Sequence, residues 1–305
     1  MLVALSLILF GSIFFLGIVN RTRSLLSGRR GPGYLQTWKD LFRLSRKGAV
    51  YSTTTSYIFQ IAPTIYFVAL FAAISVVPFG TFPALISFDG DFIFFIYVLA
   101  TGRFFLIIAA LDTGSPFEGM GANREALFGT LLEPAFLVLI GSFAMLTGKY
   151  SFYEIFNNQI FGSVEAIMMG VLATYILVQF AMIENGRMPV DDPRTHLELT
   201  MVHEVMVLDY SGIDLAMIVS TISLKFALFS MLITNFFIDP TWDWYIQSAL
   251  YTGITVVFAI TVGFLESFRA RARMRRNPLI IFMLTGLSIM IFFGVLILMN
   301  KFSIS

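Results

Sequence analysis

The chain contains the stretch Pro278-Leu-Ile-Ile-Phe-Met-Leu-Thr-Gly-Leu-Ser-Ile-Met-Ile-Phe-Phe-Gly-Val-Leu-Ile-Leu-Met299, in which no side chain is charged. About 20 predominantly apolar residues in a helix cross the hydrocarbon core of a bilayer, so we predict a transmembrane helix here. The same length and composition recur along the chain and mark eight candidate spans. They run from Leu2 to Val19, Tyr57 to Phe79, Asp91 to Leu111, Leu127 to Thr147, Val164 to Glu184, Ile213 to Phe237, Gln247 to Glu266 and Pro278 to Met299.

The composition agrees with a single membrane domain over residues 1–305. Mean hydropathy is +0.83, 57% of the residues are apolar and 13% are charged, whereas soluble domains carry roughly 45–50% apolar and about 25% charged residues. A soluble core could not bury this excess, so lipid must cover much of the surface. The predicted fold is all-α and polytopic, with about eight transmembrane helices and one amphipathic helix in the membrane plane.

Charge and cysteine content exclude several classes of function. The formal net charge is +1, so the bulk charge does not indicate a nucleic-acid partner. The chain has no cysteine, which excludes disulfides, cysteine-ligated iron–sulfur or nickel centres and a thiol nucleophile. Any redox centre must therefore belong to a partner. No basic residue precedes the first apolar run, so we do not expect a cleaved signal peptide.

Lysine and arginine are distributed unevenly over the connections between the spans. With eight spans both termini lie on one side, and the connections on the other side hold 16 of the 20 basic residues. These connections are Asn20 to Ser56, Asp112 to Ala126, Asn185 to Gly212 and Ser267 to Asn277. The positive-inside rule places them in the cytoplasm and both termini outside, with Trp242, Trp244 and Tyr245 at the outer interface of the cytoplasmic (inner) membrane.

An amphipathic helix is predicted inside the first cytoplasmic connection. At about 100° per residue its apolar side chains fall on one arc, and Lys39, Arg43, Arg46 and Lys47 fall on a neighbouring arc. A helix with this pattern lies in the membrane plane with its basic side toward the headgroups. The alternative is a generic basic loop with chance periodicity. The apolar arc consists of Tyr34, Leu35, Trp38, Leu41, Phe42 and Ser45.

The third cytoplasmic connection concentrates titratable side chains, although a simple connector would need only a few residues. With the end of the preceding span it holds Glu184, Asp191, Asp192, Glu198, Glu204, Asp209, Arg187, Arg194, His196 and His203. If the stretch after Pro193 is helical, His196 and His203 share a face. Such groups could relay protons, or they could form ordinary salt bridges in a solvated loop. A metal site is disfavoured by the seven-residue spacing of the histidines.

Ionisable residues inside the spans are a separate signal. Lys225 lies near the middle of its span, Arg103 lies in the inner half of the third, and Glu133 lies two turns into the fourth. A charge at this depth costs several kcal/mol unless it is paired or faces water. These residues therefore mark either an ion path or an internal ion pair. Glu184 and Glu266 lie at helix ends, where a solvated carboxylate costs little free energy, so each alone is a weak signal.

Three cytoplasmic segments together resemble a known family. They are Arg29-Arg-Gly-Pro with Leu35-Gln36, Asp40 and Arg43; Leu111-Asp-Thr-Gly-Ser-Pro-Phe-Glu-Gly-Met-Gly-Ala-Asn-Arg-Glu-Ala126 running on to Leu132-Glu-Pro134; and Met188-Pro-Val-Asp-Asp-Pro-Arg-Thr-His-Leu-Glu-Leu-Thr-Met-Val-His-Glu-Val-Met-Val-Leu-Asp-Tyr-Ser-Gly212. These segments are similar to the membrane-anchoring subunit of energy-converting nickel-iron hydrogenases, as in formate hydrogenlyase and hydrogenase-4. That family is related to the first membrane subunit of respiratory NADH:quinone oxidoreductase.

The hydrogenase branch is the closer resemblance. The quinone-reducing relatives tend to have an Arg early in the fourth span, where this chain has Leu132-Glu133-Pro134. The chain also departs from the family, because Leu215 to Leu224 has no acid and the first motif ends in Arg43 where a Lys is usual. The alternatives are a quinone-chamber subunit of a respiratory dehydrogenase and a freestanding secondary transporter. A transporter would be expected to show internal repeats, and none is evident.

The resemblance implies a non-redox subunit of an oxidoreductase complex, without catalytic, cofactor-binding or metal-binding residues of its own. Its partners would be the hydrogenase large and small subunits, an iron–sulfur subunit and antiporter-like membrane subunits, and the nickel-iron and iron–sulfur centres would lie in those partners. The implied coupling residues are Arg103, Glu133, Glu184, Asp191, Asp192, His196, Glu198, His203, Glu204, Asp209 and Lys225. The implied docking residues are Arg29, Arg30, Asp112, Glu118, Arg124, Arg187 and Arg194.

The distribution of basic residues predicts the topology. Reporter fusions after Lys149 and at the C-terminus should report an external position, and fusions within Ser267 to Asn277 a cytoplasmic one. A cytoplasmic C-terminus would mean that the number of spans is wrong by one.

Overall fold

The computed structural model describes residues 2–158, 164–191, 201–269 and 274–299, and these residues are largely helical. The long helices are α1 (Leu2–Leu26), α3 (Tyr57–Val76), α4 (Asp91–Asp112), α5 (Pro116–Thr147), α7 (Val164–Glu184), α9 (Gly212–Asn235), α10 (Trp244–Phe268) and α11 (Asn277–Leu298). The short ones are α2 (Gln36–Ser45), α6 (Phe152–Asn157), α8 (His203–Met206) and the 3-10 turn η1 (Met274–Arg276).

The eight predicted spans coincide with the eight long helices. Seven helices in the described part of the chain are long and apolar enough to cross a membrane. The eighth, α7, has 21 residues, and its part from Met168 to Glu184 forms a shorter apolar helix. The all-helical, polytopic fold is therefore confirmed, and the chain is a multi-pass membrane protein.

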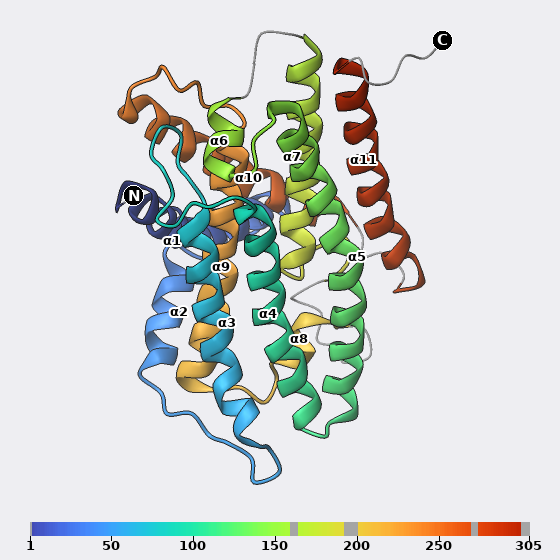
Figure 1. Cartoon of the computed structure of the whole chain (residues 1–305). Coiled ribbons are helices and arrows are strands. Elements are labelled where there is room, and N and C mark those ends of the chain that lie inside the picture. The colour runs from blue at the N-terminus through green and yellow to red at the C-terminus, as the bar shows by residue number, and fades with distance from the viewer. Residues whose placement is uncertain (1, 159–163, 192–200, 270–273, 300–305) are drawn as a thin grey trace.

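Helix α9 forms the centre of the bundle. Its most apolar window is 78% buried inside the protein, against 28% for α11 at the periphery. It packs against α1, α2, α3, α7 and α10. Helices α3, α4, α5 and α11 follow one another around the outside, each in contact with the next, as Figure 1 shows. Side chains on α9 are consequently enclosed on most sides, Lys225 among them.

Two helices extend by about two turns or more beyond a predicted end. Helix α1 continues beyond Val19 to Leu26, and α5 begins at Pro116 rather than Leu127. Pro116 occupies the first turn of α5, where the missing N–H of proline is not needed. Gly148, with a φ of 68°, ends the same helix in the left-handed conformation. Most of the predicted second cytoplasmic loop is thus helical, which corrects the predicted connection Asp112 to Ala126.

The predicted amphipathic helix is present as α2. Its apolar side is turned toward the bundle, because Leu41 is buried and the indole nitrogen of Trp38 donates to the carbonyl of Ser12 on α1 at 3.5 Å. Phe42 remains exposed and lies under the guanidinium of Arg46. The position of α2 in the plane of a membrane stays a prediction.

A buried carboxylate fixes the end of the bundle remote from α2. Asp91 in the first turn of α4 is fully buried, and its side chain accepts hydrogen bonds from the Ser151 hydroxyl at 2.8 Å and the Phe152 backbone N–H at 2.7 Å. These bonds join the start of α4 to the start of α6 and orient the segment between α5 and α6.

Replacing Asp91 with alanine should lower the free energy of unfolding by about 1–3 kcal/mol, because two buried donors lose a charged acceptor. Thermal unfolding of the purified chain in detergent, followed by tryptophan fluorescence, would show a lower Tm. Asp89→Ala removes an exposed carboxylate two residues away and serves as the control. Equal Tm values for the two variants would contradict this role of Asp91.

Candidate functional site

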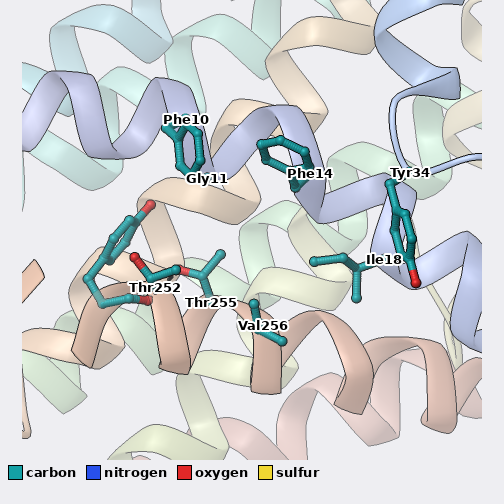
Figure 2. A pocket seen from close by; sticks show the side chains of 9 residues that line it. Phe10, Gly11, Phe14, Ile18, Tyr34, Thr252, Thr255 and Val256 are labelled. Carbon is teal, nitrogen blue, oxygen red and sulfur yellow. Dashed lines mark hydrogen bonds between the residues drawn. The ribbon is translucent and has the colours of Figure 1, made fainter. Parts of the chain in front are cut away.

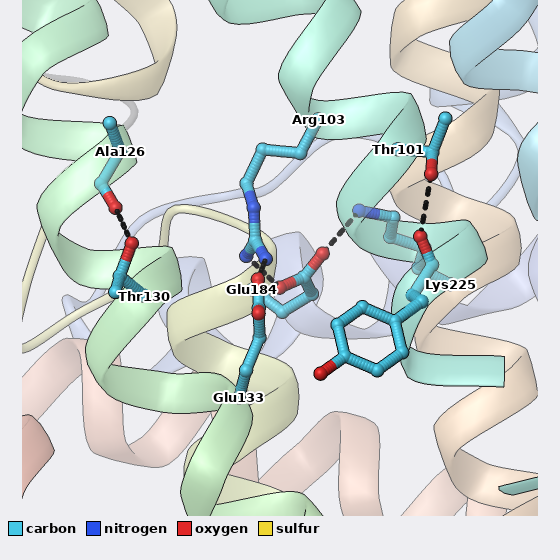
Figure 3. A network of polar contacts seen from close by, with 8 residues as sticks. Thr101, Arg103, Ala126, Thr130, Glu133, Glu184 and Lys225 are labelled. Atoms are coloured by element: carbon cyan, nitrogen blue, oxygen red, sulfur yellow. Dashed lines mark hydrogen bonds and ion pairs between the residues drawn. The ribbon is translucent and has the colours of Figure 1, made fainter. Parts of the chain in front are cut away.

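Glu184 at the end of α7 is bound to two cations from different helices. One carboxylate oxygen accepts a hydrogen bond from Arg103 of α4 at 2.6 Å, and the other accepts from the Lys225 ammonium of α9 at 2.7 Å. The second guanidinium nitrogen of Arg103 donates to Glu133 of α5 at 2.8 Å. Figure 3 shows these side chains converging from four helices. We call these four residues the central ion cluster.

Burial makes this cluster energetically costly to disturb. The exposed fraction is 6% for Arg103, 3% for Glu184 and 1% for Lys225. Charges at this depth are tolerated because each has an oppositely charged partner within hydrogen-bond distance. Loss of one partner would leave the other as an uncompensated buried charge, which costs about 3–5 kcal/mol.

The surrounding residues hold the two cations in position. A Cβ on Gly129 of α5 would lie 2.7 Å from the central carbon of the Arg103 guanidinium, so the guanidinium lies directly against the α5 backbone. The Lys225 ammonium lies 4.7 Å from the centre of the Tyr66 ring, where the negative face of the ring attracts a cation. Only glycine at 129 permits this approach of Arg103.

Two further carboxylates lie on α5. Glu125, with an exposed fraction of 7%, interacts electrostatically with Arg103, Glu184 and Lys225. Glu118 lies two helical turns closer to the start of α5 and is 1% exposed. Neither of its carboxylate oxygens has a hydrogen-bond partner among the described residues. Together with Glu133 they form a row of acids along one helix.

A second ion cluster joins α1, α10 and the segment after α7. The Glu266 carboxylate, which is fully buried, accepts from Arg23 at 2.6 Å and from Arg187 at 3.3 Å. The Arg187 guanidinium also lies 5.7 Å from the centre of the Phe226 ring. Glu184 and Glu266 are therefore not solvated helix-end carboxylates, as the sequence suggested, because each is enclosed by two cations.

The Asp191 side chain binds the backbone at the start of α8. One carboxylate oxygen of Asp191 accepts from the N–H groups of Val202 and His203 at 3.1 and 3.0 Å. His203 is 4% exposed, and neither ring nitrogen has a partner among the described residues. Burial lowers the pKa of His203 from 6.5 to about 4, and the nearby Lys225 cation lowers it further than burial alone. The imidazole is therefore neutral at physiological pH.

The docking residues implied by the resemblance fall into two groups. Arg29 and Arg30 are exposed. Asp112 accepts from the backbone N–H of Ser56 at 2.6 Å, and Arg124 donates to the carbonyl of Met201 at 3.0 Å. Glu118 is buried, and Arg187 is bound to Glu266. Most of the described residues that the resemblance assigns to docking are therefore engaged inside this chain.

The coupling residues are only partly brought together. The structure joins Arg103, Glu133, Glu184 and Lys225, with His203 within electrostatic range of Glu184 and Lys225. Glu204 is half-buried and Asp209 is exposed. The remaining predicted residues lie outside the described residues: Asp192, Arg194, His196 and Glu198.

Sequence reasoning missed Glu125, Arg23 and Tyr66. Glu125 falls seven residues after Glu118, a spacing that places both on one helix face, but the predicted helix began only at Leu127. In the described part of the chain, no group of three or more His, Asp or Glu side chains is arranged to hold a metal ion.

The lowered pKa of His203 has a consequence for stability. Because the unfolded chain binds a proton near pH 6.5 and the folded chain only near pH 4, the stabilising contribution is complete above pH 6.5. It is lost as the pH falls toward 4, by up to about 3 kcal/mol. His203→Leu should therefore flatten the decline of Tm between pH 6.5 and 4.5 in detergent. If the Tm of the wild type and of the variant fell by the same amount over this pH range, the lowered pKa of His203 would be refuted.

Known proteins match this chain over most of its length. The family profile described as NADH dehydrogenase covers residues 1–299. Hydrogenase-4 component C of Escherichia coli is 30% identical over 224 residues, 73% of this chain and 70% of that protein. Formate hydrogenlyase subunit 4 of the same organism is 28% identical over 291 residues, 92% of each chain.

The fold has a solved counterpart. A chain from the structure of the membrane-bound sulfane sulfur reductase, an archaeal respiratory membrane complex, superposes with a TM-score of 0.80 over 96% of this chain and 98% of its own length, at 18% identity. An NADH-quinone oxidoreductase subunit of Bordetella pertussis is 26% identical over 195 residues, 61% of this chain and 54% of that protein. The chain belongs to the NADH dehydrogenase subunit 1 family.

Proposed function

We propose that this chain anchors a peripheral nickel-iron hydrogenase module to the cytoplasmic membrane and couples its electron transfer to proton or sodium translocation by antiporter-like subunits. In this proposal it is a non-redox subunit with both termini outside the cytoplasm. Its partners are the hydrogenase large and small subunits and an iron–sulfur subunit. The nickel-iron and iron–sulfur centres lie in those partners, since this chain has no cysteine to ligate them.

The observation that carries the coupling proposal is the central ion cluster. It joins α4, α7 and α9 through Glu184, and α5 through Arg103 and Glu133, inside a bundle of predominantly apolar helices. Apolar residues of similar volume often hold helices together at no loss of stability. Buried ionisable groups in membrane proteins commonly serve ion pathways. A purely mechanical role for the cluster is therefore a poor explanation of its composition.

The cluster has the charge balance of a proton-holding site. Its two cations, Arg103 and Lys225, face its carboxylates Glu133 and Glu184 and, in addition, Glu125 of α5 just outside it. The three carboxylates outnumber the two cations by one, and we infer that the proton of this site is held by the acid in excess. A change in the position or charge of one member would shift that proton to another.

The row of acids on α5 offers a route into the cluster. Glu118, Glu125 and Glu133 are spaced by seven and eight residues, which corresponds to about 10–12 Å along a helix. Glu118 interacts electrostatically with Asp209, which is exposed beyond α8. We infer that a charge change at the docked module enters near Glu118 and reaches Glu184 through Glu125.

The hydrogenase assignment, rather than the quinone-reducing one, is supported by the relatives. Formate hydrogenlyase subunit 4 matches over 92% of both chains, whereas the NADH-quinone oxidoreductase relative from Bordetella pertussis matches over 61% of this chain. The fourth span also carries Glu133 next to Pro134 rather than the early Arg that is common among quinone-reducing relatives.

Lys225→Met tests the coupling. In membrane vesicles that carry the whole complex, the module should stay bound and hydrogen turnover should persist, while ion uptake per hydrogen falls by about tenfold or more, because Glu184 loses a buried cation at a cost of about 3–5 kcal/mol. Glu133→Gln, at a half-buried position, should show the same split with less risk to folding. Lys149→Met removes an exposed lysine paired loosely with Glu154 at 3.7 Å and is the control.

The outcomes separate the competing functions. Wild-type ion uptake per hydrogen in both cluster variants would end the coupling proposal and leave the chain as an anchor. Loss of the module from both variants would instead make the cluster part of the docking surface. A wild-type complex that reduces quinone and does not turn over hydrogen would replace the hydrogenase assignment with the quinone-chamber one.

A further inference from the structure

An apolar groove of about 370 Å³ runs between α1 and α10 at the surface of the bundle. Figure 2 shows Phe10, Phe14 and Ile18 on one side and Thr255 and Val256 on the other. Phe10 is 54% exposed, so the groove opens outward, toward lipid in a membrane. None of these residues belongs to the central ion cluster.

The groove offers apolar contact along its length. The Thr255 hydroxyl donates to the carbonyl of Tyr251 at 2.8 Å, and the Thr252 hydroxyl donates to that of Ser248 at 2.9 Å. Both hydroxyls are thus satisfied within α10, and their methyl groups remain to line the groove. A hydrocarbon chain matches such a surface, whereas a polar ligand would leave its own groups unpaired there.

One end of the groove is positively charged. Tyr34 lies at that end, with its backbone directly against Gly17 of α1, and the Arg21 guanidinium lies 5.9 Å from the centre of its ring. Arg21 donates one hydrogen bond, to the carbonyl of Gly31 at 3.2 Å, while its buried Nε–H has no acceptor among the described residues. Arg29 and Arg30 are exposed in the same segment.

We propose that this groove binds an anionic phospholipid of the cytoplasmic leaflet. One acyl chain lies along Phe10, Phe14 and Ile18, and the phosphate lies against the half-buried guanidinium of Arg21, with the exposed Arg29 and Arg30 adding positive charge. The lengths agree, because the eleven residue-to-residue steps from Phe10 to Arg21 extend about 16 Å along a helix and one leaflet of the hydrocarbon core is about 15 Å thick.

An anionic phospholipid accounts for both the apolar groove and the positive charge at its end. A helix of a partner subunit, about 10 Å across, would need a carboxylate beside Arg21, whereas an anionic phospholipid always carries its phosphate at the end of its acyl chains. Basic pockets beside transmembrane helices on the cytoplasmic side are the usual binding sites for anionic headgroups. The proposal does not depend on the coupling role of the central ion cluster.

Three variants test the site in the complete complex solubilised from membranes. Thr252→Trp places an indole in the groove from an exposed position on α10, so it should fold normally while excluding the acyl chain. Arg21→Gln removes the headgroup contact, and Arg21→Lys restores a charge without the guanidinium. Ile260→Trp, at a 45% exposed position of α10 away from this groove, and Lys149→Gln, which removes an exposed charge far along the chain from Arg21, are the matched controls.

The readout is the co-purified lipid, quantified by class with mass spectrometry, and the rebinding of phosphatidylglycerol after delipidation. Thr252→Trp should lose the retained anionic lipid. Arg21→Gln should lower the affinity for phosphatidylglycerol by about fivefold, the effect of one basic residue near an anionic headgroup, with partial recovery in Arg21→Lys. Phosphatidylethanolamine retention should not change.

Three results would overturn the proposal. One is an equal amount of bound anionic lipid in Thr252→Trp, Arg21→Gln and both controls. Another is equal retention of phosphatidylethanolamine and phosphatidylglycerol by the wild type, which would remove the role of charge. The third is loss of a protein subunit from Thr252→Trp with no change in lipid, which would identify the groove as a helix-docking surface.

Discussion

The Glu184 carboxylate is shared by the Arg103 guanidinium and the Lys225 ammonium, and the rest of the bundle is arranged around this contact. The three charges come from α7, α4 and α9, so the helices must approach closely enough for direct hydrogen bonds. Gly129 lets α5 close over Arg103, and the Tyr66 ring on α3 covers Lys225. Five helices are thereby positioned by one anion, since none of these charges can remain buried without the others.

Much of the fold could be predicted because crossing a bilayer is a local property of a sequence. Runs of apolar residues identified all eight long helices. The helical periodicity that places apolar and basic residues on neighbouring arcs identified α2. The errors lie where helices leave the apolar environment. The last residues of α1 and the first eleven of α5 contain Arg, Glu and Gly, and hydropathy gives no sign that a helix continues through them.

The site could be predicted only in part because its members are distant in the sequence. Lys225 and Arg103 were recognised as charges within apolar runs, but their shared partner Glu184 is 41 and 81 residues away. Position at a helix end suggested that Glu184 and Glu266 are solvated, and only the packing of neighbouring helices encloses them. Glu125 was hidden by the misplaced start of α5, and the roles of Arg124 and Arg187 as internal donors depend on loop conformations that no sequence pattern specifies.

The length of α5 has a mechanical meaning. Its 32 residues extend about 48 Å, while the hydrocarbon core of a bilayer is about 30 Å thick. The helix therefore continues without interruption from the hydrocarbon core into the aqueous phase. A helix of this kind is a nearly straight rod, so its solvent-exposed end and its buried part keep their relative positions. Pro134 is the point where bending is easiest, because proline removes a backbone hydrogen bond of the helix. Val205 of α8 lies against the rod at Gly121. The contact with α8 at Gly121, Glu125 and the backbone beneath Arg103 at Gly129 therefore lie at fixed spacings along one continuous helix.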